Sequence, residues 1–269
     1  MGGGRGGLIC VLGDAHLDVV VCAGGPVAEE TDTPARTSLG VGGQAANVAA
    51  WVVALGGRAR LIAARGTDLA SRLVAGELAR RSVELVGPVI DGRTGVVVSL
   101  TDGAATRSML TDRGVGPELA ADLLQPGWLD GCDWLHLPAY SLVAEPVAGA
   151  ALAAAGRVPR LSIDLSSTAV LQAYGLERFG ELIRRLRPAV VFGNEAEAAL
   201  IGEVPGAELV VKLGARGVRV AGTVFPARPT RPADSTGAGD AFAAGYLVGG
   251  ITLGLEAAAR AVATMGAMP

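Results

Sequence analysis

Short apolar runs rich in β-branched residues alternate with stretches of helical periodicity along most of the chain, and this alternation constrains the fold more than any other feature. The expected strands are 8–14, 59–66, 133–137, 160–165, 189–193 and 208–214, and the expected helices are 42–57, 67–81, a segment from about Glu145, 176–187, 194–202 and the run after Gly239. Strands that alternate with helices form parallel sheets covered on both faces. The sequence therefore predicts an α/β protein: a three-layer αβα fold with a mainly parallel central sheet.

Two regions break the alternation. Residues 17–23 are interpreted as a second short buried strand beside 8–14, and the polar stretch that follows, to Gly40, as loop with at most an edge strand. Residues 94–112 contain two β-rich runs around Asp102-Gly103, a dipeptide typical of hairpin turns. Strands of this kind have no place inside a three-layer sheet. We therefore expect a small β-sheet lid, built from about 15–40 and 94–110, across the carboxyl edge of the main sheet.

The expected lid has one face that the rest of the chain does not cover. Alternate residues of a strand face opposite sides, so Val96, Val98 or Leu100 should be partly exposed. Pairing of two lids across a two-fold axis would bury these side chains. The sequence therefore predicts a homodimer that forms through the lid.

Composition narrows the class of protein. The chain suits a single domain over 1–269, and a net charge of −3 with scattered basic residues gives no electrostatic footprint for nucleic acid. No run approaches the roughly 20 apolar residues of a membrane-spanning helix, and the N-terminal glycine-rich stretch is too short for a signal peptide. Three widely spaced cysteines, Cys10, Cys22 and Cys132, fit free thiols in a reducing compartment. We expect a cytoplasmic protein with no nucleic-acid or membrane partner.

The stretch PADSTGAGDAFAAGYLVG (232–249) carries the strongest chemical signal. Gly237, Ala238 and Gly239 lead into a helix, and amides at a helix start form a site for a phosphate or for the charge of a phosphoryl group in transfer. Asp240 lies in the first turn, where the helix dipole should keep it ionised, as a weak base that orients a hydroxyl. The alternative interpretation is a helix cap at Ser235 or Thr236, with Asp240 complementing the dipole.

The same stretch resembles a signature of the ribokinase-like (PfkB) carbohydrate kinases, the D-T-x-G-A-G-D pattern, here Asp234 to Asp240. Further segments resemble that family in the same order over residues 8–245: GDAHLD (13–18), GGQAANVA (42–49), TRSMLTDRG (106–114), NEAE (194–197) and KLGARG (212–217). The resemblance implies a ribokinase-like fold and an ATP-dependent kinase that transfers the γ-phosphoryl group to a hydroxymethyl group of a sugar or sugar-like substrate.

The resemblance also assigns roles. Asp240 would be the base, with the amides of 237–240 as the anion hole. The acceptor would be bound by Asp18, Gly42, Gly43, Asn47, His16 and Arg107. The nucleotide would be bound by Asn194, Lys212, Gly214, Gly217 and Thr236, and Mg²⁺ by Glu197 through water. ATP and Mg²⁺ are the implied cofactors, with a monovalent cation (K⁺) as a further candidate near Gly266.

Residue-level reasoning leaves simpler interpretations open for several of these positions. Asn194 and Glu197 would otherwise be a helix cap and a surface acid, and Gly214 and Gly217 a hairpin turn. Lys212 either contacts phosphate or extends into solvent.

Other classes of function match parts of the sequence. Gly40 to Ala45 fits G-x-G-x-x-A, but the polar segment before it is not the buried strand that a dinucleotide-binding oxidoreductase requires. A P-loop is excluded, because the only lysine lies outside G-x-x-x-x-G-K-[ST]. A nucleoside kinase and a non-catalytic sugar- or nucleotide-binding regulator of the same fold stay open. The low aromatic content of 4% favours a plain sugar over a nucleoside.

Overall fold

The computed structural model describes residues 7–101 and 107–269, without the side chain of Arg107. Its main sheet, sheet A, has nine strands in the order β13-β12-β11-β10-β9-β8-β1-β4-β5. The bounds are β1 Leu8–Leu12, β4 Arg58–Ile62, β5 Glu84–Val86, β8 Cys132–Pro138, β9 Leu161–Asp164, β10 Val190–Asn194, β11 Glu208–Lys212, β12 Val218–Val220 and β13 Thr223–Phe225. Neighbouring strands are parallel from β5 to β11, whereas β12 pairs antiparallel with both β11 and β13.

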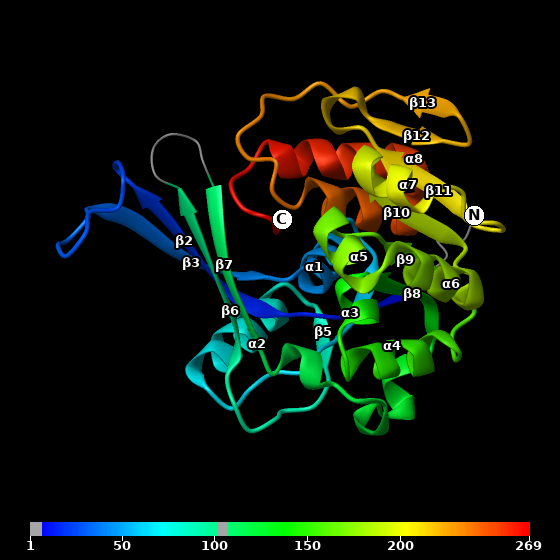
Figure 1. Cartoon of the computed structure of the whole chain (residues 1–269), viewed down its shortest axis with the longest axis horizontal. Helices are drawn as coiled ribbons and strands as arrows, with labels where there is room; N and C mark the ends of the chain where they lie inside the picture. Colours follow the sequence, from blue (N-terminus) through cyan, green and yellow to red (C-terminus); the bar gives the residue numbers. More distant parts are fainter. Residues whose placement is uncertain (1–6, 102–106) are drawn as a thin grey trace.

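Helices cover both faces of sheet A (Figure 1). The α-helices are α1 Gln44–Ala54, α2 Leu69–Arg80, α3 Tyr140–Val143, α4 Val147–Ala155, α5 Thr168–Tyr174, α6 Leu176–Leu186, α7 Glu195–Ile201 and α8 Ala238–Val262; the short 3-10 helices are η1 Gly116–Glu118, η2 Ala121–Leu123, η3 Pro126–Leu129 and η4 Gly214–Arg216. Strand β1 divides its side chains between two cores: Ile9 and Val11 pack with α1, α2 and α8, whereas Leu8, Cys10 and Leu12 pack with α4 and α6. The predicted three-layer fold is confirmed.

A second sheet, sheet B, projects from one side of the body (Figure 1). It has four strands in the order β3-β2-β6-β7: β2 His16–Ala23, β3 Ala35–Gly42, β6 Thr94–Thr101 and β7 Arg107–Gly114. The strands come from the two segments that break the alternation, and β6 and β7 pair antiparallel as a hairpin should. The predicted turn, Asp102-Gly103, lies outside the described residues.

The burial of β2 differs from the prediction. Residues 17–23 were expected to be a buried strand beside β1, but β2 belongs to sheet B and only Ala23 of it is buried. Its apolar residues fill the faces of a thin sheet, so an apolar run did not signal a core strand here. Val96, Val98 and Leu100 of β6 are partly exposed, as predicted.

Helix α8 is the one described helix that is long and apolar enough to cross a membrane by length and composition. Half of its most apolar window is buried inside the protein, and non-helical backbone at Gly249 and Gly250 interrupts it. Its buried side chains, among them Phe242 and Leu255, belong to the core on one face of sheet A. Helix α8 is therefore explained as a core helix.

Candidate active site

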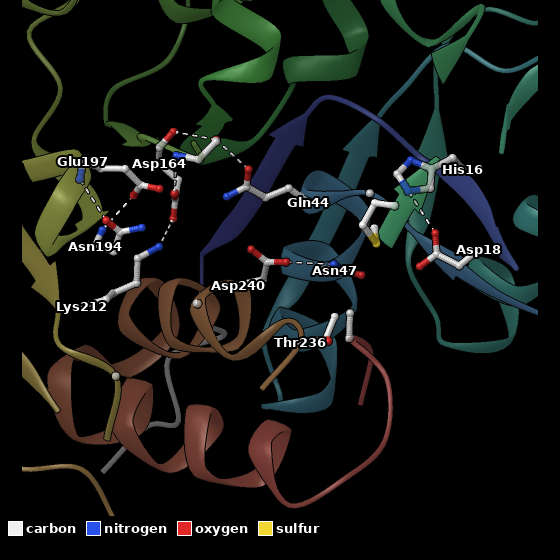
Figure 2. A pocket seen from close by; sticks show the side chains of 16 residues that line it. His16, Asp18, Gln44, Asn47, Asp164, Asn194, Glu197, Lys212, Thr236 and Asp240 are labelled. Carbon is white, nitrogen blue, oxygen red and sulfur yellow. Dashed lines mark hydrogen bonds and ion pairs between the residues drawn. The ribbon is translucent and has the colours of Figure 1, made fainter. Parts of the chain in front are cut away.

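A cavity of about 480 Å³ lies where the parallel strands of sheet A end. Asp164, Asn194 and Lys212 are the last residues of β9, β10 and β11, so the topology brings their side chains to one edge. Helix α1, the start of α8 and sheet B complete the wall. The lining residues are His16, Asp18, Gly43, Gln44, Asn47, Met109, Asp164, Ser166, Asn194, Glu197, Lys212, Gly214, Thr236, Gly239, Asp240 and Ala267 (Figure 2).

The loop before α8 has the geometry of an anion site. Gly237 is the N-cap residue, with φ 74°, and a side chain there would overlap the backbone of Ala267. The amides of Gly239 and Asp240 lie in the first turn, where an α-helix supplies them with no carbonyl partner. Thr236 instead donates from its amide and hydroxyl to Asp234, at 2.9 and 2.6 Å. The interpretation of Ser235 or Thr236 as the helix cap is therefore wrong.

Asp240 faces Asn47 across the middle of the cavity (Figure 2). Asn47 Nδ2 donates to Asp240 Oδ2 at 2.9 Å. Burial raises the pKa of Asp240 to about 7; the hydrogen bond from Asn47 lowers it, the carboxylate of Asp164 raises it further and Lys212 lowers it. The prediction that the helix dipole keeps Asp240 ionised, as a weak base, is wrong, because desolvation outweighs the dipole at this position.

Asp18 and His16 of β2 line the end of the cavity formed by sheet B. His16 Nε2 lies 3.1 Å from Asp18 Oδ1. A side chain at Gly42 would overlap the carboxylate of Asp18, so glycine at this position makes room for the acid. Gly43 begins α1 as its N-cap residue and lines the cavity.

The opposite end of the cavity holds Asn194 and Glu197. Asn194 caps α7: its Oδ1 accepts from the amide of Glu197 at 2.9 Å, and Glu197 Oε2 accepts from the amide of Asn194 at 2.8 Å. The helix-cap interpretation of Asn194 is confirmed, and that of a surface acid is wrong, since Glu197 is 4% exposed. Burial raises the pKa of Glu197.

Lys212 does not extend into solvent. Its Nζ lies 2.7 Å from Asp164 Oδ2, and the side chain is 17% exposed. Gly214 lines the cavity beside it, whereas Gly217 packs against the backbone of Phe225 in the turn between β11 and β12 and does not line it.

Some predicted site residues lie outside the cavity wall. Gly42, Gly237 and Ala238 adjoin wall residues in the sequence but do not line the cavity, and the side chain of Arg107 is outside the described part of the chain. Five wall residues were not predicted: Gln44, Met109, Asp164, Ser166 and Ala267. Only Asp164 gave a usable signal, an acid that ends an apolar strand.

Comparison with known proteins agrees with this geometry. The model of the pfkB family carbohydrate kinases matches residues 7–268. The chain belongs to the pfkB family. A fructokinase from Klebsiella pneumoniae is 32% identical over 272 residues, which cover 90% of this chain and 84% of that protein.

Solved structures show the same fold. Adenosine kinase from Sinorhizobium meliloti superposes with a TM-score of 0.84 at 21% identity, covering 99% of this chain and 96% of that one. A protein named ribokinase II from E. coli, in complex with ATP and Mg²⁺, superposes with a TM-score of 0.82 at 20% identity, covering 97% and 94%. This pfkB protein is therefore an ATP-dependent carbohydrate kinase with a ribokinase-like fold. Gly40 and Val41, at the start of the dinucleotide-like pattern, lie in β3, an edge strand of sheet B, so that pattern has no oxidoreductase context.

Proposed function

We propose that this kinase phosphorylates a hydroxymethyl group of a neutral sugar, with Asp240 as the base. The position of Asp240 carries the proposal. It lies between the nucleotide-side residues Lys212 and Asp164 and the acceptor-side residue Asn47, in the helix turn whose amides form the anion loop (Figure 2). We define the anion loop as residues 237–240.

The transfer step follows from this arrangement. The acceptor oxygen attacks the γ-phosphorus, the bond from that phosphorus to the β–γ bridging oxygen breaks, and ADP leaves with that electron pair. The hydroxyl proton passes to Asp240, and the amides of the anion loop stabilise the charge on the moving phosphoryl group. A pKa of about 7 suits a base that accepts a proton at neutral pH.

The residues of the nucleotide end fit Mg²⁺ bound through water. Mg²⁺ keeps several waters and takes few carboxylates, and Glu197 is a buried carboxylate that lines the cavity. When bound, Mg²⁺ would neutralise phosphate charge during transfer. We further propose a monovalent cation beside the anion loop, where the Gly266 amide donates to Asp234 Oδ2 at 3.1 Å; replacing K⁺ by Na⁺ should then lower the rate.

The acceptor end favours a sugar over a nucleoside. Its described walls consist of Asp18, His16, Asn47, Gly43 and Met109, which offer no phenyl, phenol or indole ring for a base to stack on. Asn47 donates a hydrogen bond to Asp240 through Nδ2. The Oδ1 atom of Asn47 is buried and has no hydrogen-bond partner among the described residues, so it is available as an acceptor. Asp18 is a second acceptor, so the walls match the hydroxyl donors of a polyol. The carboxylate of Asp18 also disfavours an anionic acceptor.

A substrate panel tests the proposal. ADP release would be measured with ATP and fructose, glucose, ribose, 2-keto-3-deoxygluconate or adenosine, using Asp240→Asn as the inactive control. We expect a neutral sugar to give the highest kcat/KM. Faster turnover with adenosine would support the nucleoside alternative, and faster turnover with 2-keto-3-deoxygluconate would contradict the neutral acceptor.

The outer face of sheet B supports the proposed homodimer. Leu39, Val19, Val98 and Leu110 lie opposite one another across the four strands, so their side chains share one face. Leu39 and Leu110 are 64% and 59% exposed. Asp18 lies on the other face, toward the cavity. Sedimentation at micromolar concentration should show a dimer, and Val98→Asp should shift it to monomer.

A further inference from the structure

Lys212 is the only lysine in a sequence whose other cationic side chains are arginine and histidine. Its ammonium reaches the carboxyl edge of sheet A from the end of β11, beside the anion loop. A Cβ built at Gly239 would lie 3.2 Å from Lys212 Nζ, so the glycine leaves room for the ammonium against the first turn of α8. The lysine therefore borders the amides that would hold the transferred phosphoryl group.

Asp164 fixes the ammonium at that place. Its carboxylate is 1% exposed, and Oδ2 accepts from Lys212 Nζ at 2.7 Å. The other oxygen, Oδ1, accepts from the amide of Ser166 at 3.0 Å. The hydroxyl of Ser166 donates to Gln44 Oε1 at 2.7 Å, on the same helix as Asn47. Hydrogen bonds thus tie Lys212 to the helix that orients Asp240.

We propose that Asp164 is a positioning residue for phosphoryl transfer, which holds the ammonium of Lys212 beside Gly239 of the anion loop. This inference rests on the proposed role of Asp240 as the base. A lysine on a flexible four-carbon stem is a mobile point charge. Anchoring by a buried carboxylate keeps that charge in place before the nucleotide arrives, so less reorganisation is needed in the transition state.

Lys212 and Asp164 also place a positive and a negative charge near Asp240. Asp240 is faced by Asp164 from β9, Lys212 from β11 and the amides of Asn47 and Gln44 from α1. Other charged or titratable groups of the cavity are Glu197 on α7 and His16 and Asp18 on β2. Burial lowers the pKa of Lys212, but Asp164 and the other carboxylates outweigh it and the net pKa is raised, so the ammonium persists.

Removal of each partner should therefore move the pH profile in opposite directions. Asp164 raises and Lys212 lowers the pKa of Asp240. Asp164→Asn should shift the acid limb of kcat/KM to lower pH, and Lys212→Met should shift it to higher pH, each by roughly 0.5–1 pH unit. Asp164→Asn should lower kcat about 10-fold and Lys212→Met about 100-fold or more, with little change in the KM of the sugar.

Two further variants complete the design. The double variant Asp164→Asn/Lys212→Met leaves no unpaired charge, so it guards against misfolding; its acid limb should return toward that of the wild type while kcat stays low. Glu256→Gln removes one partner of a half-exposed pair, with Arg228, and should change nothing. An unshifted limb in Asp164→Asn would overturn the proposal, as would shifts of both single variants in the same direction. Should Asp164→Asn not fold, Lys212→Met and the double variant decide by the same comparison.

The single lysine permits a readout without turnover. Protein grown on lysine labelled with ¹³C at Cε gives one lysine signal by NMR. Adding Mg²⁺ and a non-hydrolysable ATP analogue should shift that signal in the wild type and in Glu256→Gln, and Asp164→Asn should change its position before nucleotide is added. An unchanged signal with nucleotide would overturn the placement of Lys212. This readout stays decisive even if no acceptor in the panel is phosphorylated, an outcome that would count against the proposed function alone.

Discussion

The two ends of the cavity are built in different ways. The transfer end consists of strand termini of sheet A and helix starts: Asp164, Asn194 and Lys212 end buried parallel strands, and Asp240 lies in the first turn of α8. The acceptor end includes a four-stranded sheet with one exposed apolar face. Side chains of the transfer end are linked by hydrogen bonds and an ion pair, whereas Asp18 at the acceptor end adjoins His16.

This difference predicts a division of labour. Buried charges that influence one another should govern kcat and the pH profile, because each alters the ionisation of its neighbours. Exposed strands whose side chains reach the cavity should govern binding of the acceptor and the exclusion of water. The predictions below test that division, from the largest expected effect to the smallest.

Replacement of the proposed base, Asp240, should give the largest loss of kcat. Asp240→Asn keeps an oxygen for the hydrogen bond from Asn47 but cannot take the hydroxyl proton, so kcat should fall by about 10²–10⁴-fold. The Kd of ATP, measured by calorimetry, should stay nearly unchanged. Glu256→Gln, an exposed acid, serves as the control. Wild-type kcat in Asp240→Asn would remove this residue from the mechanism.

A substitution at the acceptor end should weaken binding of the sugar and leave binding of ATP nearly unchanged. Asp18→Ala removes an acceptor of hydroxyl hydrogen bonds, so the affinity for the sugar should fall by about 10–100-fold while that for ATP stays within about two-fold. Calorimetry with each ligand measures both. Equal losses for sugar and ATP would indicate a folding defect and contradict the division between the two ends.

The same two ends differ in how much of them the sequence could predict. The anion loop, Asp18 and Asn47 follow from short motifs in which glycines and polar residues stand at fixed spacing. Asp164 was missed because its meaning depends on Lys212, which lies 48 residues away and becomes its neighbour only in the folded sheet. The layers followed from the alternation of strands and helices. The placement of β2 could not be predicted in this way, because a short apolar run has the same sequence pattern in a core strand and in a lid strand.

The raised pKa of Asp240 also could not be predicted from the sequence. A helix start is visible in the letters, but desolvation depends on what the fold packs around the carboxylate, here including Asn47, Asp164 and Lys212. These come from an α-helix and two strands of different segments. Local rules thus gave the residue and its loop, whereas its pKa is a property of the assembled site.

A further difference between the two ends of the cavity would be that sheet B, at the acceptor end, closes over the cavity when the sugar binds. Amides of β6 (Thr94–Thr101) should exchange hydrogen more slowly, by about 10-fold, when the sugar is bound, because closure reduces local opening. Amides of β9 and β10, in the interior of sheet A, should show no comparable change. Mass spectrometry of peptides after exchange measures both. Equal protection of β6 with and without the sugar would contradict closure.

The smallest effect concerns stability, and it follows from the raised pKa of Asp240. The folded state holds the proton up to about pH 7, whereas the unfolded chain loses it near the ordinary value of 3.8. The folded state therefore loses stability as pH rises from about 4 to 7, and the loss is complete above pH 7.

The variant Asp240→Asn has no carboxyl group at this position and does not lose stability in this way. At pH 8 it should be more stable than the wild type by about 1–2 kcal/mol, since the carboxylate borders an open cavity, and about 2–4 °C in Tm accompanies each kcal/mol. At pH 4 the two proteins should unfold at the same temperature. Calorimetry at both pH values tests this, because a catalytic acid buried at the transfer end destabilises the folded state above its raised pKa. A variant Asp240→Asn that is less stable than the wild type at pH 8 would contradict the raised pKa.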